Sequence, residues 1–289
     1  MRSLIATPAP ISRRAALLLA VAATGVLAVA CNDDSKAPNN ARIAYGASQV
    51  LGNGTARTYV SLNAAGQPVS IGVALSEAAL NNLPMTPNAP SPSAVMLQLA
   101  LPADAPVQGY NHVMLDWNPA GHEPDHVYTL PHFDFHFYKI TPAQVMAMMP
   151  SDPQWNTKAA SLPAANFVPA GYQAAHVLAN IPAGAAAVPM MGLHWLDVSS
   201  PELQPPPANQ TFTETFIYGS YDGAFIFLEP MITKAYLESV KVNGGKSRTI
   251  PTAAQVATAG YYPSAYSIRY DAAAKEYRIS LDSLVLRQP

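Results

Sequence analysis

The chain has 289 residues and a single cysteine. One cysteine excludes an intramolecular disulfide framework and any zinc or iron–sulfur site built from several thiolates. Only 12% of the side chains are charged, and 16 Lys and Arg against 18 Asp and Glu give a formal charge of −2. That balance excludes a strongly basic surface, so we expect no nucleic-acid partner. The sequence also lacks a G-x-S-x-G motif and a P-loop, which leaves a serine hydrolase or a P-loop nucleotide site unsupported.

The longest small-apolar run covers residues 15–30 and is interrupted by one hydroxyl side chain. It is shorter than the ~20 residues that a resident transmembrane helix needs. Arg2, Arg13 and Arg14 precede it, and no acidic residue occurs before Asp33. This order of a basic segment, an apolar run and small residues predicts an export signal over residues 1–30. The Arg13-Arg14 pair also resembles a twin-arginine signal, so the general and twin-arginine routes both stay open.

The lone cysteine, Cys31, directly follows Leu27-Ala28-Val29-Ala30. This string resembles a bacterial lipobox, although Leu27 lies four residues before the cysteine rather than three. We therefore expect lipidation at Cys31. The acyl chains would anchor the N-terminus at a membrane surface and locate the protein in the cell envelope. The alternative is ordinary signal cleavage that leaves a free thiol.

Residues 31–42 are polar and predict a tether, and residues 43–289 fit one domain. Strand patterns dominate that domain, which predicts a mainly β (α+β) fold with an antiparallel sheet or a barrel-like core and a few short helices. The expected hairpins pair residues 55–62 with 69–75, 211–218 with 224–228, and 266–270 with 276–286. The expected helices cover residues 77–83, capped by Ser76, 143–149, capped by Thr141, and 234–239, capped by Thr233.

Seven histidines are present, and four of them occur between residues 122 and 136. The segment 132–138 alternates strictly, so three phenylalanines share one face of a predicted strand. That face belongs in a core. The opposite face presents His132, Asp134, His136 and Tyr138 to a common space.

Spacing limits what this row of side chains can bind. Neighbours on one face of a strand are about 7 Å apart, so His132 and His136 reach one ion only if the strand bends. Further ligands must come from elsewhere. The best candidates are His194 and Glu229, and His122 and His126 are alternatives in a loop. The predicted metal ligands are therefore His132, Asp134, His136, His194 and Glu229, with zinc, iron, manganese or nickel as the cofactor.

Two other interpretations remain open. The histidine row can be a structural polar network in a non-catalytic binding protein or an oligomer-forming envelope protein. Alternatively, Trp117, Trp155 and Trp195 can stack on sugars in a carbohydrate-binding module. Catalytic residues, a small-molecule ligand and a reaction are not identified by any of these patterns.

Several strings resemble a bacterial family of unknown function that is typed on a TTHB-series hypothetical protein of a thermophile. The strings lie at residues 54–59, 131–138, 192–195, 216–223 and 227–233. The resemblance covers about residues 50 to 240 and places all five candidate metal ligands inside recognised motifs. It implies a secreted or lipid-anchored protein and a homo-oligomer, and it transfers no catalytic residue.

Overall fold

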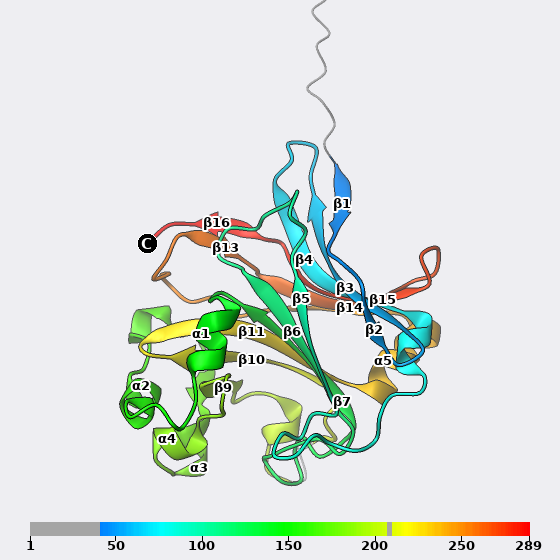
Figure 1. Ribbon diagram of the computed structural model, residues 1–289. Coiled ribbons are helices and arrows are strands. Elements are labelled where there is room, and N and C mark those ends of the chain that lie inside the picture. Colours follow the sequence, from blue (N-terminus) through cyan, green and yellow to red (C-terminus); the bar gives the residue numbers. More distant parts are fainter. Residues whose placement is uncertain (1–40, 207–209) are drawn as a thin grey trace, which may run out of the picture. The chain divides into compact units, whose positions relative to one another are not determined.

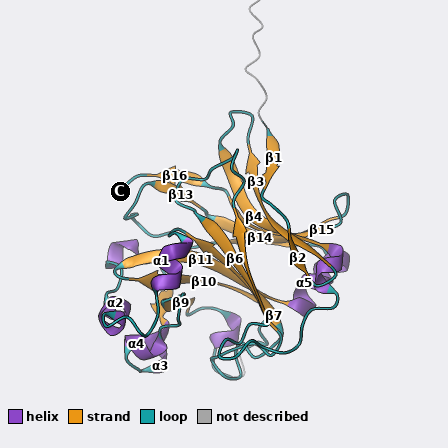
Figure 2. Ribbon diagram, viewed as in Figure 1, coloured by secondary structure: helices purple, strands orange, loops and turns teal. Residues whose placement is uncertain are grey.

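The computed structural model describes residues 41–206 and 210–289. The predicted export signal, residues 1–30, and Cys31 lie outside the described residues. Among the described residues, no helix combines the length and the apolar character needed to cross a membrane. The described chain is mainly β, and all of its paired strands are antiparallel, which confirms the predicted fold class (Figure 2).

Two seven-stranded sheets account for most of the fold (Figure 1). The first sheet contains β1 (Arg42–Tyr45), β2 (Gln49–Leu51), β3 (Gly54–Leu62), β4 (Pro68–Ser76), β12 (Lys246–Thr249), β14 (Ala265–Asp271) and β15 (Glu276–Asp282). The second sheet contains β5 (Val95–Ala100), β6 (His112–Asn118), β7 (His132–Tyr138), β8 (Tyr172–Ala174), β9 (Leu193–Asp197), β10 (Glu214–Tyr221) and β11 (Ala224–Thr233). Strands β13 (Gly260–Tyr262) and β16 (Val285–Arg287) form a separate pair.

The helices are short, as expected. They are α1 (Pro142–Ala147), α2 (Trp155–Ala160), α3 (Ala175–Ala179), α4 (Ala183–Ala186), α5 (Lys234–Asn243) and the 3-10 turns η1 (Glu77–Leu80), η2 (Ala165–Phe167) and η3 (Pro201–Leu203). Thr141 and Gln144 form a reciprocal capping box at α1, and Thr233 caps α5. Ser76 does not cap η1, because its hydroxyl accepts a hydrogen bond from the backbone of Thr55.

Hydrophobic side chains from both sheets form one core cluster, so the sheets pack face to face. Strand β7 contributes Phe133, Phe135 and Phe137, which are fully buried, as the alternation predicted. The ring of Phe216 on β10 lies 5.1 Å from the ring of Tyr266 on β14, in the other sheet. The core is therefore a pair of packed antiparallel sheets, and no closed barrel occurs in the described part of the chain.

The strand order of the second sheet positions the polar row. This order is β5-β6-β7-β11-β10-β9-β8, so β11 inserts beside β7 although the long segment 139–223 separates them in sequence. The hairpin of β10 and β11 turns at Asp222 and Gly223, both with positive φ, which is the geometry of a tight two-residue turn. The predicted hairpins at 55–75 and 211–228 are thus confirmed, while the segment 276–286 is divided between β15 and β16.

Candidate metal centre

The face of the second sheet that points away from the core carries a row of polar side chains on β6 and β7. The register sets Asp116 opposite Asp134, Met114 opposite His136, and Asn118 opposite His132. All seven residues of each strand are buried. The strands therefore place two carboxylates and three imidazoles, those of His112, His132 and His136, on one covered face.

Two further strands extend this row across the sheet. Glu229 lies on β11 next to β7, and it pairs with Ile217 on β10. His194 on β9 pairs with Gly219 on β10. A Cβ atom at Gly219 would lie 2.1 Å from the ring of Phe227, so only glycine lets this ring pack over β10. Phe227 in turn contacts the rings of His136 and His194.

The first group of candidate ligands contains His136, His194 and Glu229. Their ligand atoms all lie within 4.8 Å of one another. The Nε2 atom of His136 lies 3.3 Å from Oε1 of Glu229, and the Nε2 atom of His194 lies 3.8 Å from Oε2. Bonds of about 2.1 Å at tetrahedral angles separate two ligand atoms by about 3.4 Å, so these distances suit one shared ion.

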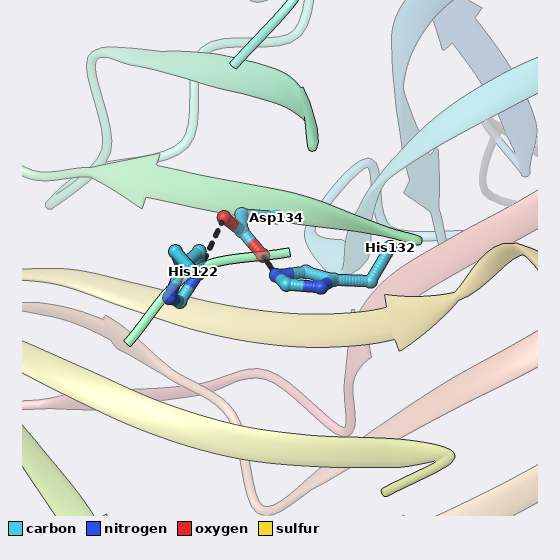
Figure 3. Close-up of side chains that lie close together, drawn as sticks. All are labelled: His122, His132 and Asp134. Carbon is cyan, nitrogen blue, oxygen red and sulfur yellow. Dashed lines mark ion pairs between the residues drawn. The ribbon is translucent and has the colours of Figure 1, made fainter. Parts of the chain in front are cut away.

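The second group contains His122, His132 and Asp134, again within 4.8 Å of one another. Figure 3 shows the Asp134 carboxylate between the two imidazole rings. The Nε2 atom of His132 lies 3.1 Å from Oδ1, and the Nε2 atom of His122 lies 3.4 Å from Oδ2. Both groups therefore consist of two imidazoles and one carboxylate.

Several buried atoms of this row have no hydrogen-bond partner. They are Nε2 of His112, both carboxylate oxygens of Asp116, Oδ1 of Asp134, both ring nitrogens of His136 and Oε2 of Glu229. These five residues are at most 3% exposed. Buried polar atoms in proteins are normally hydrogen-bonded, and each unsatisfied group costs about 1–3 kcal/mol or more. Such a concentration of unsatisfied donors and acceptors is typical of side chains that converge on a ligand.

Electrostatics keep His194 neutral. Burial, followed by the charge of His136, lowers the pKa of His194 to about 3. Burial also raises the pKa of Glu229 to about 8. Burial opposes protonation of His136, but the Glu229 and Asp116 carboxylates outweigh it and raise its pKa to about 9. The first group thus offers one neutral imidazole and a His136–Glu229 pair that holds protons when no cation is bound.

The second group has the charge distribution of an ion pair. Burial disfavours protonated His122, but Asp134 outweighs it and raises the pKa of His122 to about 9. Burial also disfavours the charged form of Asp134, yet the neighbouring His132 and His122 hold its pKa well below the usual range. The Asp134 carboxylate is therefore charged and ready to bind a cation.

The structure divides the five sequence-predicted ligands between the two groups. His136, His194 and Glu229 meet in the first, and His132 and Asp134 meet in the second together with His122, one of the two loop alternatives. His126, the other alternative, is exposed and lies in neither group.

Two further polar residues on β6, Asp116 and Asn118, were not among the predicted ligands. Asn118 donates a hydrogen bond of 2.6 Å to Oδ2 of Asp134, and Asp116 lies 3.2 Å from Nδ1 of His136. A signal was present, because His112, Asp116 and Asn118 share one face of the strand 112–118, on which only Met114 is apolar.

The three tryptophans do not form a sugar-stacking surface. Trp117, Trp155 and Trp195 are between 1% and 6% exposed. Their indole nitrogens donate to Pro84, Gly184 and Ser220, respectively, inside the protein. This burial removes the observation on which the carbohydrate-binding alternative rests.

The comparison with protein families agrees with the resemblance noted in the sequence. Residues 63–117 match the sequence model of the family described as TTHB210-like, hypothetical protein TTHB210. The matched segment contains β4, β5 and most of β6, including Asp116. The histidine motif at 131–138 and the other ligands of both groups lie outside it. No curated protein and no solved structure matches the chain.

Proposed function

We propose that the protein is an exported, lipid-anchored cell-envelope protein that binds a divalent transition metal through His136, His194 and Glu229. One observation carries the metal site. Nε2 of His136 and Oε2 of Glu229 are buried without a hydrogen bond, and both residues have ligand atoms within 4.8 Å of an imidazole nitrogen of His194.

A bound cation accounts for this arrangement better than a polar network does. In a network, each buried donor would face an acceptor, and the free energy of burial would be recovered through hydrogen bonds. Here His136 lies between Asp116 and Glu229 without hydrogen-bond geometry to either of them. A divalent ion satisfies the lone pairs of both imidazoles and neutralises the buried carboxylate.

The ligand set restricts the choice of metal. Two imidazole nitrogens and one carboxylate suit zinc, iron, manganese or nickel. Three protein ligands leave a coordination position free, and an ion held in this way activates a bound water or binds oxygen. Glu229 and His136 fix the site from adjacent strands, and His194, whose side chain is 18% exposed, lies on its more accessible side.

Elemental analysis of the purified mature protein tests the proposal. We expect about one equivalent of transition metal at this site in the wild type, and its loss in Glu229→Gln, which keeps the size of the side chain, and in His194→Ala. His112→Ala is the matched control, because His112 is also a buried histidine on β6 but belongs to neither group. Circular dichroism establishes that each variant is folded.

The rival function is a non-catalytic binding or oligomer-forming envelope protein with a structural histidine cluster. It predicts that Glu229→Gln and His194→Ala contain as much metal as the His112→Ala control. That result would refute the metal proposal. It would leave the predicted lipid anchor to be tested separately.

A further inference from the structure

The group of His122, His132 and Asp134 has the residue types and the geometry of a metal site. His132 and Asp134 extend from β7, and His122 reaches the same carboxylate from the loop after β6 (Figure 3). Each imidazole faces a different oxygen of Asp134. The side chain of His132 is fully buried, and that of Asp134 is 4% exposed.

Backbone carbonyls fix the protonation of both rings. Nδ1 of His132 lies 2.7 Å from the carbonyl oxygen of Leu130, and Nδ1 of His122 lies 2.7 Å from that of Glu123. A carbonyl oxygen only accepts, so each Nδ1 must donate its proton. In a neutral ring, Nε2 then carries a lone pair that faces the carboxylate, whereas in a protonated ring, which burial opposes but Asp134 favours at His122 by raising its pKa, Nε2 donates its proton toward the carboxylate.

A positive charge is needed between each Nε2 and the carboxylate, and either a proton on Nε2 or a metal ion that replaces it supplies this charge. Histidines that bind metals through Nε2 commonly donate Nδ1–H to a backbone carbonyl, which fixes the tautomer and the ring orientation. His122 and His132 both have this arrangement. The distance of 3.1 Å from Nε2 of His132 to Oδ1 of Asp134 is close to the separation of about 3.4 Å expected between two ligands of one tetrahedral ion, and the ligand atom of His122 lies within 4.8 Å of those of the other two residues.

The carboxylate is also positioned in a way that leaves one oxygen free. The side-chain amide of Asn118 donates to Oδ2 of Asp134, and Ser93 in turn donates to the amide oxygen of Asn118 at 2.9 Å. Oδ1 is buried and accepts no hydrogen bond. An outer pair of side chains therefore orients Asp134, while Oδ1 stays available as a ligand.

One member of this group, His122, lines a cavity. This cavity, of about 330 Å³, is lined by residues 89–92 and 120–123 together with Asp125 and Thr129. His122 belongs to this lining, and its side chain is 22% exposed. A metal ion with three protein ligands keeps an open position, and here the cavity would supply that position with water or a small ligand.

We propose that His122, His132 and Asp134 form a second divalent transition-metal site, separate from the first group and accessible from the cavity beside His122. This site rests on its own contacts, so it does not depend on the site proposed above. Together the two groups would give the sheet a capacity of two ions per chain.

Zn²⁺ titration of the metal-free mature protein, followed by elemental analysis, tests the second site. We expect two equivalents in the wild type, one in His122→Ala, one in His194→Ala and none in the double variant. Asp134→Asn should also lose one equivalent, and it retains the size of the side chain in case His122→Ala alters the loop. Asp125→Asn is the matched control, since Asp125 lines the same cavity but is not in the group.

Each site fails in a distinguishable way. One equivalent in the wild type that is retained in His122→Ala and Asp134→Asn, and lost in His194→Ala, would overturn the second site and leave the first. One equivalent that is lost only in His122→Ala and Asp134→Asn would support the second site and refute the first. An absence of bound Zn²⁺ in the wild type would refute both.

Discussion

Nδ1 of His136 lies 3.2 Å from Oδ2 of Asp116, and both side chains are fully buried. The two residues come from adjacent strands, and the register sets Asp116 opposite Asp134, two positions away from His136. A carboxylate beside one nitrogen of a ring whose other nitrogen faces a metal site is a common way to orient the ring. If the first group binds a metal as proposed, we expect Asp116 to act as a positioning residue for His136.

Removal of the Asp116 charge should weaken metal binding without emptying the site. We expect Asp116→Asn to lower the affinity for Zn²⁺ about 10–100-fold, as for other residues that orient metal-binding histidines. Calorimetric titration of the folded variant measures the change. Met114→Leu, a change of similar volume on the same face of β6, should bind Zn²⁺ as the wild type does. Equal affinities in the two variants would contradict a positioning role for Asp116.

Acid should compete with the metal at the first group. Burial raises the pKa of Glu229 to about 8, and the neighbouring carboxylates, acting against burial, raise that of His136 to about 9. Metal binding requires the deprotonated forms, so it must release protons, and the apparent affinity must increase with pH. We expect Zn²⁺ affinity to rise at least about tenfold between pH 6 and pH 8. Titrations in buffers with different ionisation enthalpies count the released protons, and an affinity independent of pH would contradict these ligands.

The contact between the two sheets includes a buried carboxylate on β10. Glu214 accepts hydrogen bonds from Arg248 and Tyr266, both on strands of the first sheet, and its side chain is 1% exposed. We expect Glu214→Gln to lower the free energy of unfolding by about 1–3 kcal/mol, because Arg248 and the buried Tyr266 hydroxyl lose a charged acceptor. Chemical denaturation measures the change.

An exposed ion pair provides the control for Glu214. Glu238 pairs with Lys234 on α5, and its side chain is 45% exposed. Glu238→Gln should change the free energy of unfolding by less than about 0.5 kcal/mol, because solvent screens such pairs. If both substitutions had the same small effect, Glu214 would not be important for the contact between the sheets.

The predicted lipid anchor is tested by its only candidate residue. We expect Cys31→Ala to move the protein from the membrane fraction to the soluble fraction after export, because acyl chains on Cys31 would hold the wild type at the membrane surface. Fractionation and immunoblotting measure the distribution. Continued membrane association of Cys31→Ala would show that another part of the chain is responsible.

Local patterns in the sequence predict much of the fold. The turn residues at 63–67 and 222–223 locate two hairpins, and the alternation at 132–138 assigns the phenylalanines to the core and the histidines to the opposite face. These features depend only on residues close together in the chain.

The composition of the two groups could not be predicted in the same way. It depends on which strands become neighbours, and β11 pairs with β7 across the segment 139–223. This pairing separates Glu229 from Asp134, and the loop after β6 brings His122 to Asp134. The position of Asp116 likewise depends on the register between β6 and β7.

Anomalous X-ray diffraction from crystals of the Zn²⁺-loaded protein, recorded at the zinc absorption edge, tests the central claim most directly. We predict an anomalous peak about 2.0–2.2 Å from the ligand atoms of His136, His194 and Glu229. In crystals of Glu229→Gln we expect no anomalous peak at this position, because the ion is lost. A wild-type map without a peak at these three residues, with their nitrogen and oxygen atoms hydrogen-bonded to ordered water instead, would contradict the account.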